Sequence, residues 1–398
     1  MSPAASYTMA ESVAKVDLTK LIKVRTVTVG LSLPNDEALW RAALTHAKAF
    51  THAARARLNA AGYEVQTVRL CTNPFEEFVD VEDGASALAQ LKRLATLLDD
   101  VGVDNLSLGP AATRSGVLLI PGILRLSKKL YASAAVPDSF SRDLCTDIAG
   151  VVLEISKTDP EANFQFCAAF NVPPGVPFYP AAYHRGAKAS FALGCETSAL
   201  LWDALPRAGG DLREAQRLLR EAFQAHLAPL ELIALALSRE HGVAYGGIDA
   251  SVAPAPDCPP LTESFASLDL GAFGESGTLA VSALVTGAVK AVDVKLCGYS
   301  GLMLPVLEDV GLATSGLFRV HDLLMYSAVC GIGLDTVPVP GDVPQHKLAA
   351  LMLDVAALAF RLNKPLSARL FPVPGKRAGE LTDFKNPFLC NGPILDVP

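Results

Sequence analysis

The order of apolar segments near the start of the chain is the feature that constrains the fold most. Residues 22–33 (IKVRTVTVGLSL) are β-branched and alternate in polarity, which predicts a strand, and the polar residues 35–36 are suited to cap a helix. Apolar positions then recur at helical spacing over 39–58, Gly62 predicts the helix end, and a second strand is expected over 63–70. This order favours parallel strands joined by helices that cover the sheet.

The same alternation continues along the chain. In the first half it predicts a helix over 85–98 and strands near Leu106 and over 117–120, 150–156 and 190–193. In the second half it predicts helices over 212–241 and 344–362 and from Thr278, Gly301 and Arg319, with strands near 294–297, Thr336 and 367–371. Residues 178–190 and 252–268 are rich in proline, and we expect them to be irregular. The pattern predicts an α/β protein.

Composition places the chain among globular proteins of the cytoplasm. With 398 residues and 51% hydrophobic content, it can bury a large core without disulfides or metal. Residues 1–20 contain charges and no apolar run, so we expect a flexible N-terminal extension before a single domain over 21–398, and no export signal. The apolar segment 278–289 ends at Lys290, too short for a bilayer span, so no membrane association is expected.

Charge and cysteine content narrow the class further. The net charge is −7 and the basic residues are scattered, which argues against nucleic acid as a partner. The eight cysteines are widely spaced with no C-x-x-C pair, as expected of reduced thiols in the cytosol.

Three glycine-containing turns in the last third are the first candidates for a site, and each is expected to precede a helix. They span 274–278, 298–301 and 340–342. Helix N-termini expose unpaired N–H groups that bind carboxylates or phosphates, whereas a single turn of this kind is more often an ordinary cap. Their recurrence favours a small anionic ligand, and the candidate binding residues are Gly277, Thr278, Tyr299, Ser300, Gly301, Gly341 and Lys376.

Acidic residues sit in or beside these turns: Asp249, Glu263, Glu308, Asp309, Asp335 and Asp342. Paired carboxylates act as acid and base or hold a hard cation. Asp335 and Asp342 flank the T-V-P-V-P-G segment and are the best pair for a divalent cation. The alternative is a set of ordinary exposed carboxylates, since no recognised metal-ligand spacing joins them, and the cofactor stays open.

The catalytic candidates are His184, Asp249, Asp335 and Cys330. His184 lies in a loop rich in proline and tyrosine, where an imidazole can titrate against a ligand or simply hydrogen-bond within the loop. Cys330 ends a helix and enters a glycine turn, and the alternative for it is a buried structural thiol. Basic residues that can complement an anion are Lys295, Arg369, Lys376 and Arg377.

Several segments together resemble the domain of unknown function 711 (DUF711, UPF0210) family. They are residues 22–30, 178–184, 247–254, 298–309, 326–331, 334–342 and 363–376, and the resemblance extends from about residue 22 to about residue 380. It implies a barrel of about ten mostly parallel strands in two halves around a central loop, with helices outside, similar to the barrels of pyruvate formate-lyase-like glycyl radical enzymes. Radical chemistry is not implied, because Gly375 stands in P-V-P-G-K instead of the radical motif and Cys330 has no cysteine partner beside it.

Together these features predict a non-radical enzyme that acts on a small anionic metabolite, a carboxylate or an amino-acid derivative, with His184 and Asp249 or Asp335 as acid and base. The rival is a ligand-binding or regulatory protein that senses such a metabolite without turnover, and a structural subunit is a third alternative. The family resemblance implies a small ACT-domain protein as a partner, and the apolar, helix-rich exterior suits a homodimer.

Overall fold

The computed structural model describes residues 21–398, so the predicted N-terminal extension lies outside the described residues. Its strands are β1 (Lys23–Leu31), β2 (Val65–Pro74), β3 (Leu106–Gly109), β4 (Leu130–Val136), β5 (Phe166–Phe170), β6 (Ser190–Glu196), β7 (Ala244–Asp249), β8 (Gly333–Pro340) and β9 (Leu366–Val373). The α-helices are α2 (Trp40–Ala60), α3 (Gly84–Val101), α4 (Arg114–Leu126), α5 (Arg142–Thr158), α6 (Ser198–Arg207), α7 (Leu212–His241), α8 (Leu261–Ala266), α9 (Thr278–Lys290), α10 (Val310–Ser315), α11 (Val320–Tyr326) and α12 (Gln345–Arg361). Short 3-10 helices include η1 (Glu37–Leu39) and η3 (Pro160–Gln165).

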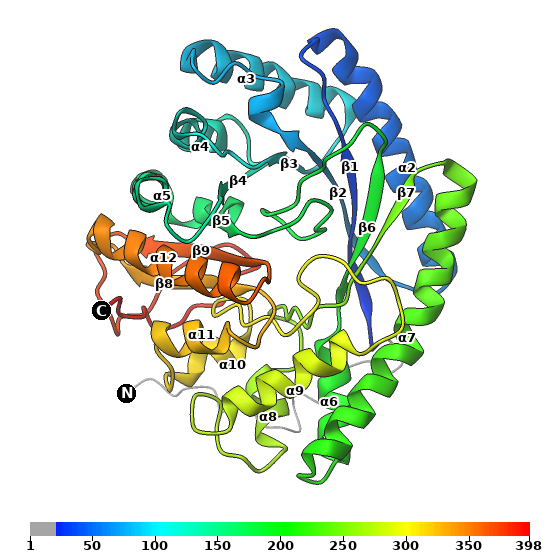
Figure 1. Ribbon diagram of the computed structural model, residues 1–398, viewed down its shortest axis with the longest axis vertical. Coiled ribbons are helices and arrows are strands. Elements are labelled where there is room, and N and C mark those ends of the chain that lie inside the picture. The colour runs from blue at the N-terminus through cyan, green and yellow to red at the C-terminus, as the bar shows by residue number, and fades with distance from the viewer. Residues whose placement is uncertain (1–20) are drawn as a thin grey trace.

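The strands form one continuous, mostly parallel sheet with helices around it (Figure 1), in the order β7-β6-β1-β2-β3-β4-β5-β9-β8. Strands β1 to β5 run parallel to one another. At one end β6 pairs antiparallel with β1, and at the other β9 pairs antiparallel with β5, each continuing into a parallel partner. The predicted α/β class is therefore confirmed. Within residues 21–398, none of the helices has the length and apolar character needed to cross a bilayer.

The N-terminal strand, helix and strand form as predicted. The Asp36 side chain accepts the N–H of Ala38 at 3.0 Å and caps η1, from which α2 continues. The inner face of α2 buries Leu44 and Phe50 against the sheet, and Gly62 follows the helix with φ of +92°. That dihedral favours glycine because it has no Cβ, which explains why the helix ends there.

Some predicted elements were wrong. Residues 117–120 and 150–156 were expected to be strands but lie in α4 and α5. A short β-branched apolar run is equally compatible with the buried face of a helix. No helix begins at Gly301, because its carbonyl accepts the N–H of Val252 at 3.0 Å and the backbone pairs across the fold. Residues 294–297 form only an isolated bridge at Leu296.

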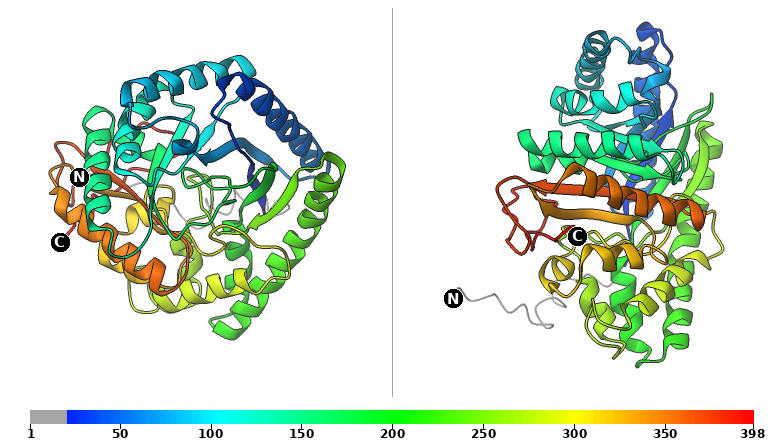
Figure 2. Two further views of the ribbon diagram at one scale, coloured as in Figure 1. Left: turned by 45° about the horizontal axis from the view of Figure 1, so that its top comes forward. Right: turned by 60° about the vertical axis from the view of Figure 1, so that its left-hand side comes forward.

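A loop between β5 and β6, residues 171–189, lies at the centre of the molecule (Figure 2, left). The hydroxyl of Thr28 donates to the carbonyl of Pro177 at 2.7 Å, and that of Ser107 donates to Pro180 at 3.0 Å. A buried apolar cluster, separate from the main core between sheet and helices, joins this loop to the second half of the chain; it contains Cys167, Val176, Phe178, Ala181, Ala253, Tyr299, Met303 and Ile332. The loop is therefore packed from both sides.

Residues 295–306 run between the two edge strands. The N–H of Ile248 in β7 donates to the backbone carbonyl of Lys295 at 2.8 Å, and the N–H of Val306 donates to the backbone carbonyl of Asp335 in β8 at 3.0 Å. Isolated parallel bridges accompany these bonds at both edges. This segment therefore contacts both ends of the sheet order.

Replacing Gly30 by alanine tests how tightly β1 packs on the central loop. A Cβ at Gly30 would lie 2.7 Å from Nδ1 and 2.9 Å from Cβ of His184. We expect Gly30→Ala to lower the free energy of unfolding by about 1–3 kcal/mol, measured by urea denaturation. Gly287→Ala is the matched control, since its Cβ meets only the end of the Gln216 side chain at 3.1 Å. Equal losses in the two variants would contradict the tight packing.

Candidate functional site

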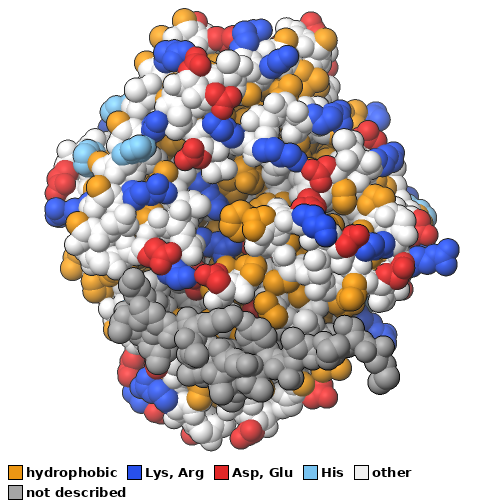
Figure 3. All heavy atoms as spheres, turned by 180° about the vertical axis from the view of Figure 1, so that it is seen from behind, with side chains coloured by type: hydrophobic (Ala, Val, Ile, Leu, Met, Phe, Trp, Pro, Cys, Tyr) orange, Lys and Arg blue, Asp and Glu red, His pale blue; other side chains and the backbone are white. Residues whose placement is uncertain are grey.

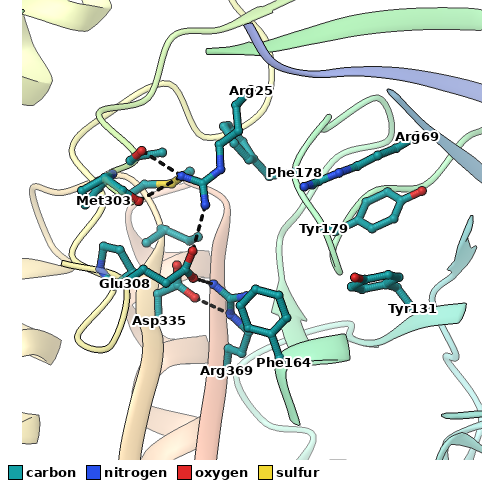
Figure 4. Close-up of a pocket in the computed structure, with 14 residues that line it drawn as sticks. Arg25, Arg69, Tyr131, Phe164, Phe178, Tyr179, Met303, Glu308, Asp335 and Arg369 are labelled. Carbon is teal, nitrogen blue, oxygen red and sulfur yellow. Dashed lines mark hydrogen bonds and ion pairs between the residues drawn. The ribbon is translucent and has the colours of Figure 1, made fainter. Parts of the chain in front are cut away.

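A cavity lies where arginines from three strands point toward one another (Figure 4): Arg25 from β1, Arg69 from β2 and Arg369 from β9. Its remaining lining residues come from the central loop and from five other parts of the chain; they are Tyr131, Phe164, Phe178, Tyr179, Ala253, Pro254, Met303, Pro305, Glu308, Ile332 and Asp335. The free volume is about 60 Å³, enough for about four to six water molecules. Seen from behind, Lys and Arg side chains gather in a hollow at the centre of the face (Figure 3).

Two of the arginines form a buried ion-pair network with two carboxylates. Arg369 donates through Nε to Asp335 at 2.7 Å and through its terminal nitrogen to Glu308. Arg25 donates to the other oxygen of Glu308 at 2.8 Å, so this carboxylate bridges β1 and β9. Burial opposes the charge on Arg369, but Asp335 and Glu308 outweigh it and raise the pKa of Arg369.

The backbone around this network fixes its geometry. Arg25 also donates to the carbonyls of Ala253 and Pro254, at 3.0 and 2.9 Å. The register of β8 against β9 shifts just after Leu334, where Thr336 has a φ of +45° that is rare for a β-branched residue. Such irregularities re-aim side chains next to functional sites. Here the irregularity lies directly beside Asp335.

Arg69 differs from the other two arginines because it forms no ion pair or hydrogen bond with a carboxylate within residues 21–398, although Glu308 lies close enough to favour its charge. Its guanidinium lies over the ring of Tyr179, 4.9 Å from the ring centre. Burial lowers the pKa of Arg69, but an arginine still carries its charge at neutral pH. With three arginines and two carboxylates in its lining, the cavity keeps one uncompensated positive charge.

Two tyrosines face this charge, and they differ in their hydrogen bonds. The Tyr179 hydroxyl donates to the carbonyl of Leu70 and accepts the N–H of Ser107, at 3.0 Å for the second. The ring of Tyr131 lies 4.7 Å from that of Tyr179, and its hydroxyl has no partner among the described residues. Burial raises the pKa of Tyr131, while Arg69 and Arg369 act in the opposite direction. Tyr131 is therefore a protonated hydroxyl at neutral pH.

Of the residues singled out from the sequence, Asp335 lies in the cavity, together with Arg369 and Glu308. Asp249 does not line it. Its carboxylate accepts the N–H groups of Tyr299 and Ser300 at 2.8 and 3.0 Å, and the hydroxyl of Ser251 at 2.5 Å. Because the predicted helix is absent, the donors of this turn bind the chain's own carboxylate, with Gly301 donating to the Ser251 hydroxyl at 3.3 Å.

His184 is buried outside the cavity lining and is bonded to its own loop and to the first residue of β6. Nε2 lies 3.0 Å from the carbonyl of Gly186, and Nδ1 lies 3.2 Å from the hydroxyl of Ser190. Burial lowers the pKa of His184, which favours the neutral imidazole. Both ring nitrogens hold the central loop in place.

The remaining predicted residues lie apart from the cavity lining. Cys330 is buried, and burial raises the pKa of its thiol. At the start of α9, Gly277 packs against Leu270, and the Thr278 hydroxyl accepts the N–H of Gly274 at 2.9 Å. Beyond the ends of β8 and β9, Gly341 donates to the carbonyl of Lys376 at 3.2 Å. The Lys376 ammonium is bonded to Leu381 and Asp383, at 2.7 and 2.9 Å.

The pair proposed for a divalent cation is not brought together. Asp335 lies within β8 and is bonded to Arg369, while Asp342 is exposed beyond the strand end. The strand alone, from Asp335 to its end at Pro340, spans roughly 16 Å, far more than a shared ion allows. Among residues 21–398 there is no group of three or more His, Cys, Asp or Glu side chains placed to hold a metal.

Sequence inspection missed Arg25, Arg69 and Tyr131. The sequence does contain an indication for Arg25 and Arg69. Each is a charged residue that interrupts an otherwise apolar or β-branched strand pattern at a position near the core. Charged residues are rarely buried without a partner or a function. Tyr131 lies in an alanine-rich strand that was not predicted, so nothing pointed to it.

The three arginines should contribute differently to stability. Arg369→Met leaves Glu308 and Asp335 without their shared partner, and we expect a loss of about 3–5 kcal/mol in the free energy of unfolding. Arg69→Met removes a buried charge that pairs with no carboxylate, so it should be neutral or stabilising. Urea denaturation of both variants measures the contrast. A similar loss in both would show that Arg69 is a structural residue.

Asp309, next to Glu308, provides a pH test of this segment. Burial raises its pKa to about 6, although its carboxylate accepts the N–H groups of Leu261 and Leu312 at 3.0 and 2.8 Å. Since the folded state holds this proton more tightly than the unfolded state, stability falls as pH rises from about 4 to about 6, by about 3 kcal/mol. Asp309→Asn should lack this part of the slope when unfolding is measured against pH. An unchanged difference between the two proteins across that range would contradict the assignment.

Comparison with known proteins identifies relatives along nearly the whole chain. The family described as "Uncharacterised ACR (DUF711)" matches residues 18–385. A UPF0210 protein of Pyrobaculum aerophilum is 31% identical over 352 residues, covering 81% of this chain and 76% of the relative. UPF0210 proteins of Acetivibrio thermocellus and Lactobacillus delbrueckii are 26% and 28% identical, covering 94% and 97% of this chain and 91% and 93% of the relatives. The chain belongs to the DUF711 (UPF0210) family.

Proposed function

We propose that the arginine-lined cavity is the substrate site of a non-radical enzyme acting on a small anionic metabolite, a carboxylate or an amino-acid derivative. The observation that supports this most is Arg69, a partly buried guanidinium without a carboxylate partner among the described residues. Leaving a charge unpaired in a buried site costs stability and is kept where a ligand supplies the counter-charge.

The charge and size of the cavity limit the part of the ligand that enters it. One uncompensated positive charge is neutralised by one negative charge, and a guanidinium presents paired donors that match a carboxylate. A free volume of about 60 Å³ takes a carboxylate and only a few further atoms. The cavity therefore favours a monoanion over a phosphorylated or polyanionic ligand.

Tyr131 supplies the group that distinguishes an enzyme from a binding protein. Its hydroxyl is protonated, has no partner among residues 21–398, and faces the same cavity as Arg69. A ligand held by Arg69 would lie beside it, so Tyr131 can donate a proton to the substrate. Glu308 and Asp335 are held by Arg25 and Arg369, and their role is to orient those arginines.

We also infer that the strands close into a barrel. Residues 295–306 bond to both edge strands, and as a tenth, irregular strand they would close the ring around the central loop. Barrel closure would make the cavity an end pocket. The non-radical assignment rests on Gly375, whose surroundings lack the radical motif, and on Cys330, which has no cysteine partner beside it in the sequence and is not among the lining residues.

The alternative is a ligand-binding or regulatory protein, because Arg69 alone is enough to hold an anion. A cytoplasmic location, a homodimer and an ACT-domain partner remain proposals from the sequence and the family resemblance.

Acetate and acetamide test the binding part of the proposal, since they match in size and differ in charge. We expect acetate to raise the free energy of unfolding, by about 2.7 kcal/mol at a concentration one hundred times its Kd, and acetamide to have no effect. In Arg69→Met the acetate effect should be lost. Equal responses to acetate in the variant and the natural protein would overturn the assignment.

Turnover is tested separately with Tyr131→Phe. The natural protein is incubated with a mixture of short carboxylates that includes hydroxy, oxo and amino acids, and consumption is followed by NMR. We expect one of them to be consumed, and Tyr131→Phe to bind it while losing at least tenfold in rate. Binding without any consumption would favour the regulatory alternative.

A further inference from the structure

We infer that a groove beside the cavity holds an apolar, planar extension of the substrate, so that the substrate is a carboxylate with an aromatic or similarly flat tail. This inference rests on the proposed function, because it assumes that the carboxylate binds at Arg69. The groove lies between η3 and residues 385–388 and has a volume of about 360 Å³, compared with about 60 Å³ for the cavity.

The groove and the cavity share two walls. Tyr131 and Phe164 line both, so the two spaces adjoin at these rings, and a molecule that extends from the cavity into the groove would lie beside them. The cavity itself has room for little more than a carboxylate. Any larger substrate must therefore extend into the groove.

The walls of the groove suit a flat apolar group. Phe164 stacks against Phe388 with a ring-centre distance of 6.2 Å and an angle of 6° between the planes. On the cavity side, the Arg369 guanidinium lies 4.9 Å from the Phe164 ring centre. Phe388 is 58% exposed, so its ring is accessible to a group bound in the groove. The nearly parallel rings form one wall on which a planar substituent can stack.

The charges around the groove sum to zero, so they do not select a second charged group. Lys128 forms an ion pair with Asp159 at 2.7 Å, and the Glu161 carboxylate accepts the backbone N–H of Lys385 at 2.7 Å. The two lysines and two acids of the lining cancel. The uncompensated positive charge in the cavity then fixes one end of the substrate, and the neutral, aromatic groove receives the other.

The probes are 3-phenylpropionate and acetate, which carry the same carboxylate and differ in the aromatic tail. Calorimetric titration of the natural protein should give an affinity for 3-phenylpropionate at least tenfold higher than for acetate. In Phe388→Ala the ratio of the two affinities should fall by about three- to tenfold, because stacking on the groove wall is lost. Phe140→Ala is the matched control, since Phe140 is 89% exposed and lies outside both linings, and its ratio should equal that of the natural protein.

The outcomes separate this inference from the proposed function. If acetate binding depends on Arg69 but the affinity ratio is close to one, or does not change in Phe388→Ala, the groove assignment is wrong and the anion site stands. If neither probe binds, or binding survives Arg69→Met, both proposals are wrong. A ratio that falls in Phe388→Ala and not in Phe140→Ala supports the groove.

Discussion

The buried interaction of Glu308 with two arginines is the contact on which the architecture around the cavity depends. Arg25 belongs to the parallel block β1 to β5, and Arg369 belongs to the pair β8 and β9 that runs in the opposite direction. Glu308, which lies in an irregular segment, forms ion pairs with both arginines across the cavity. Removing charges from water is expensive, so such a network is retained only when its members satisfy one another or when a ligand completes it.

The network is complete except for one charge. Arg369 forms ion pairs with both carboxylates and Arg25 with Glu308, whereas Arg69 forms no ion pair among the described residues and lies over the face of Tyr179. If all the arginines were structural, a third acid in the lining would be expected, and the lining contains only Glu308 and Asp335 among the described residues. This shortage of negative charge is the basis for our proposal that an anionic ligand binds in the cavity and extends into the adjoining groove.

The architecture followed from local patterns better than the site did. The predicted helix over 212–241 coincides with α7, and Asp36 and Gly62 lie at the helix boundaries where capping chemistry placed them. Strands β4 and β5 escaped prediction because LYASAAV and FCAAF are rich in alanine, which has little preference for strands, and burial in the sheet overrides that preference.

The site was harder to predict because it is assembled by tertiary contacts. The turn at Tyr299 and Ser300 does bind an anion with its N–H groups, as its composition suggested, but the anion is Asp249. Whether such donors are already occupied depends on tertiary contacts with distant segments, which the sequence of the turn does not show. Of the residues named from the sequence, Asp335, Glu308 and Arg369 line the cavity. Arg69 lines it too, but in the sequence it resembles an ordinary strand residue.

Anomalous diffraction from crystals soaked in bromide tests the unpaired charge most directly, because bromide is a small monoanion whose position can be seen without knowledge of the substrate. The charge imbalance predicts a bromide peak in the cavity within reach of the Arg69 guanidinium and the Tyr131 hydroxyl, and no such peak in Arg69→Met crystals. Bromide found only on the outer surface, or a cavity peak that persists without Arg69, would contradict the account.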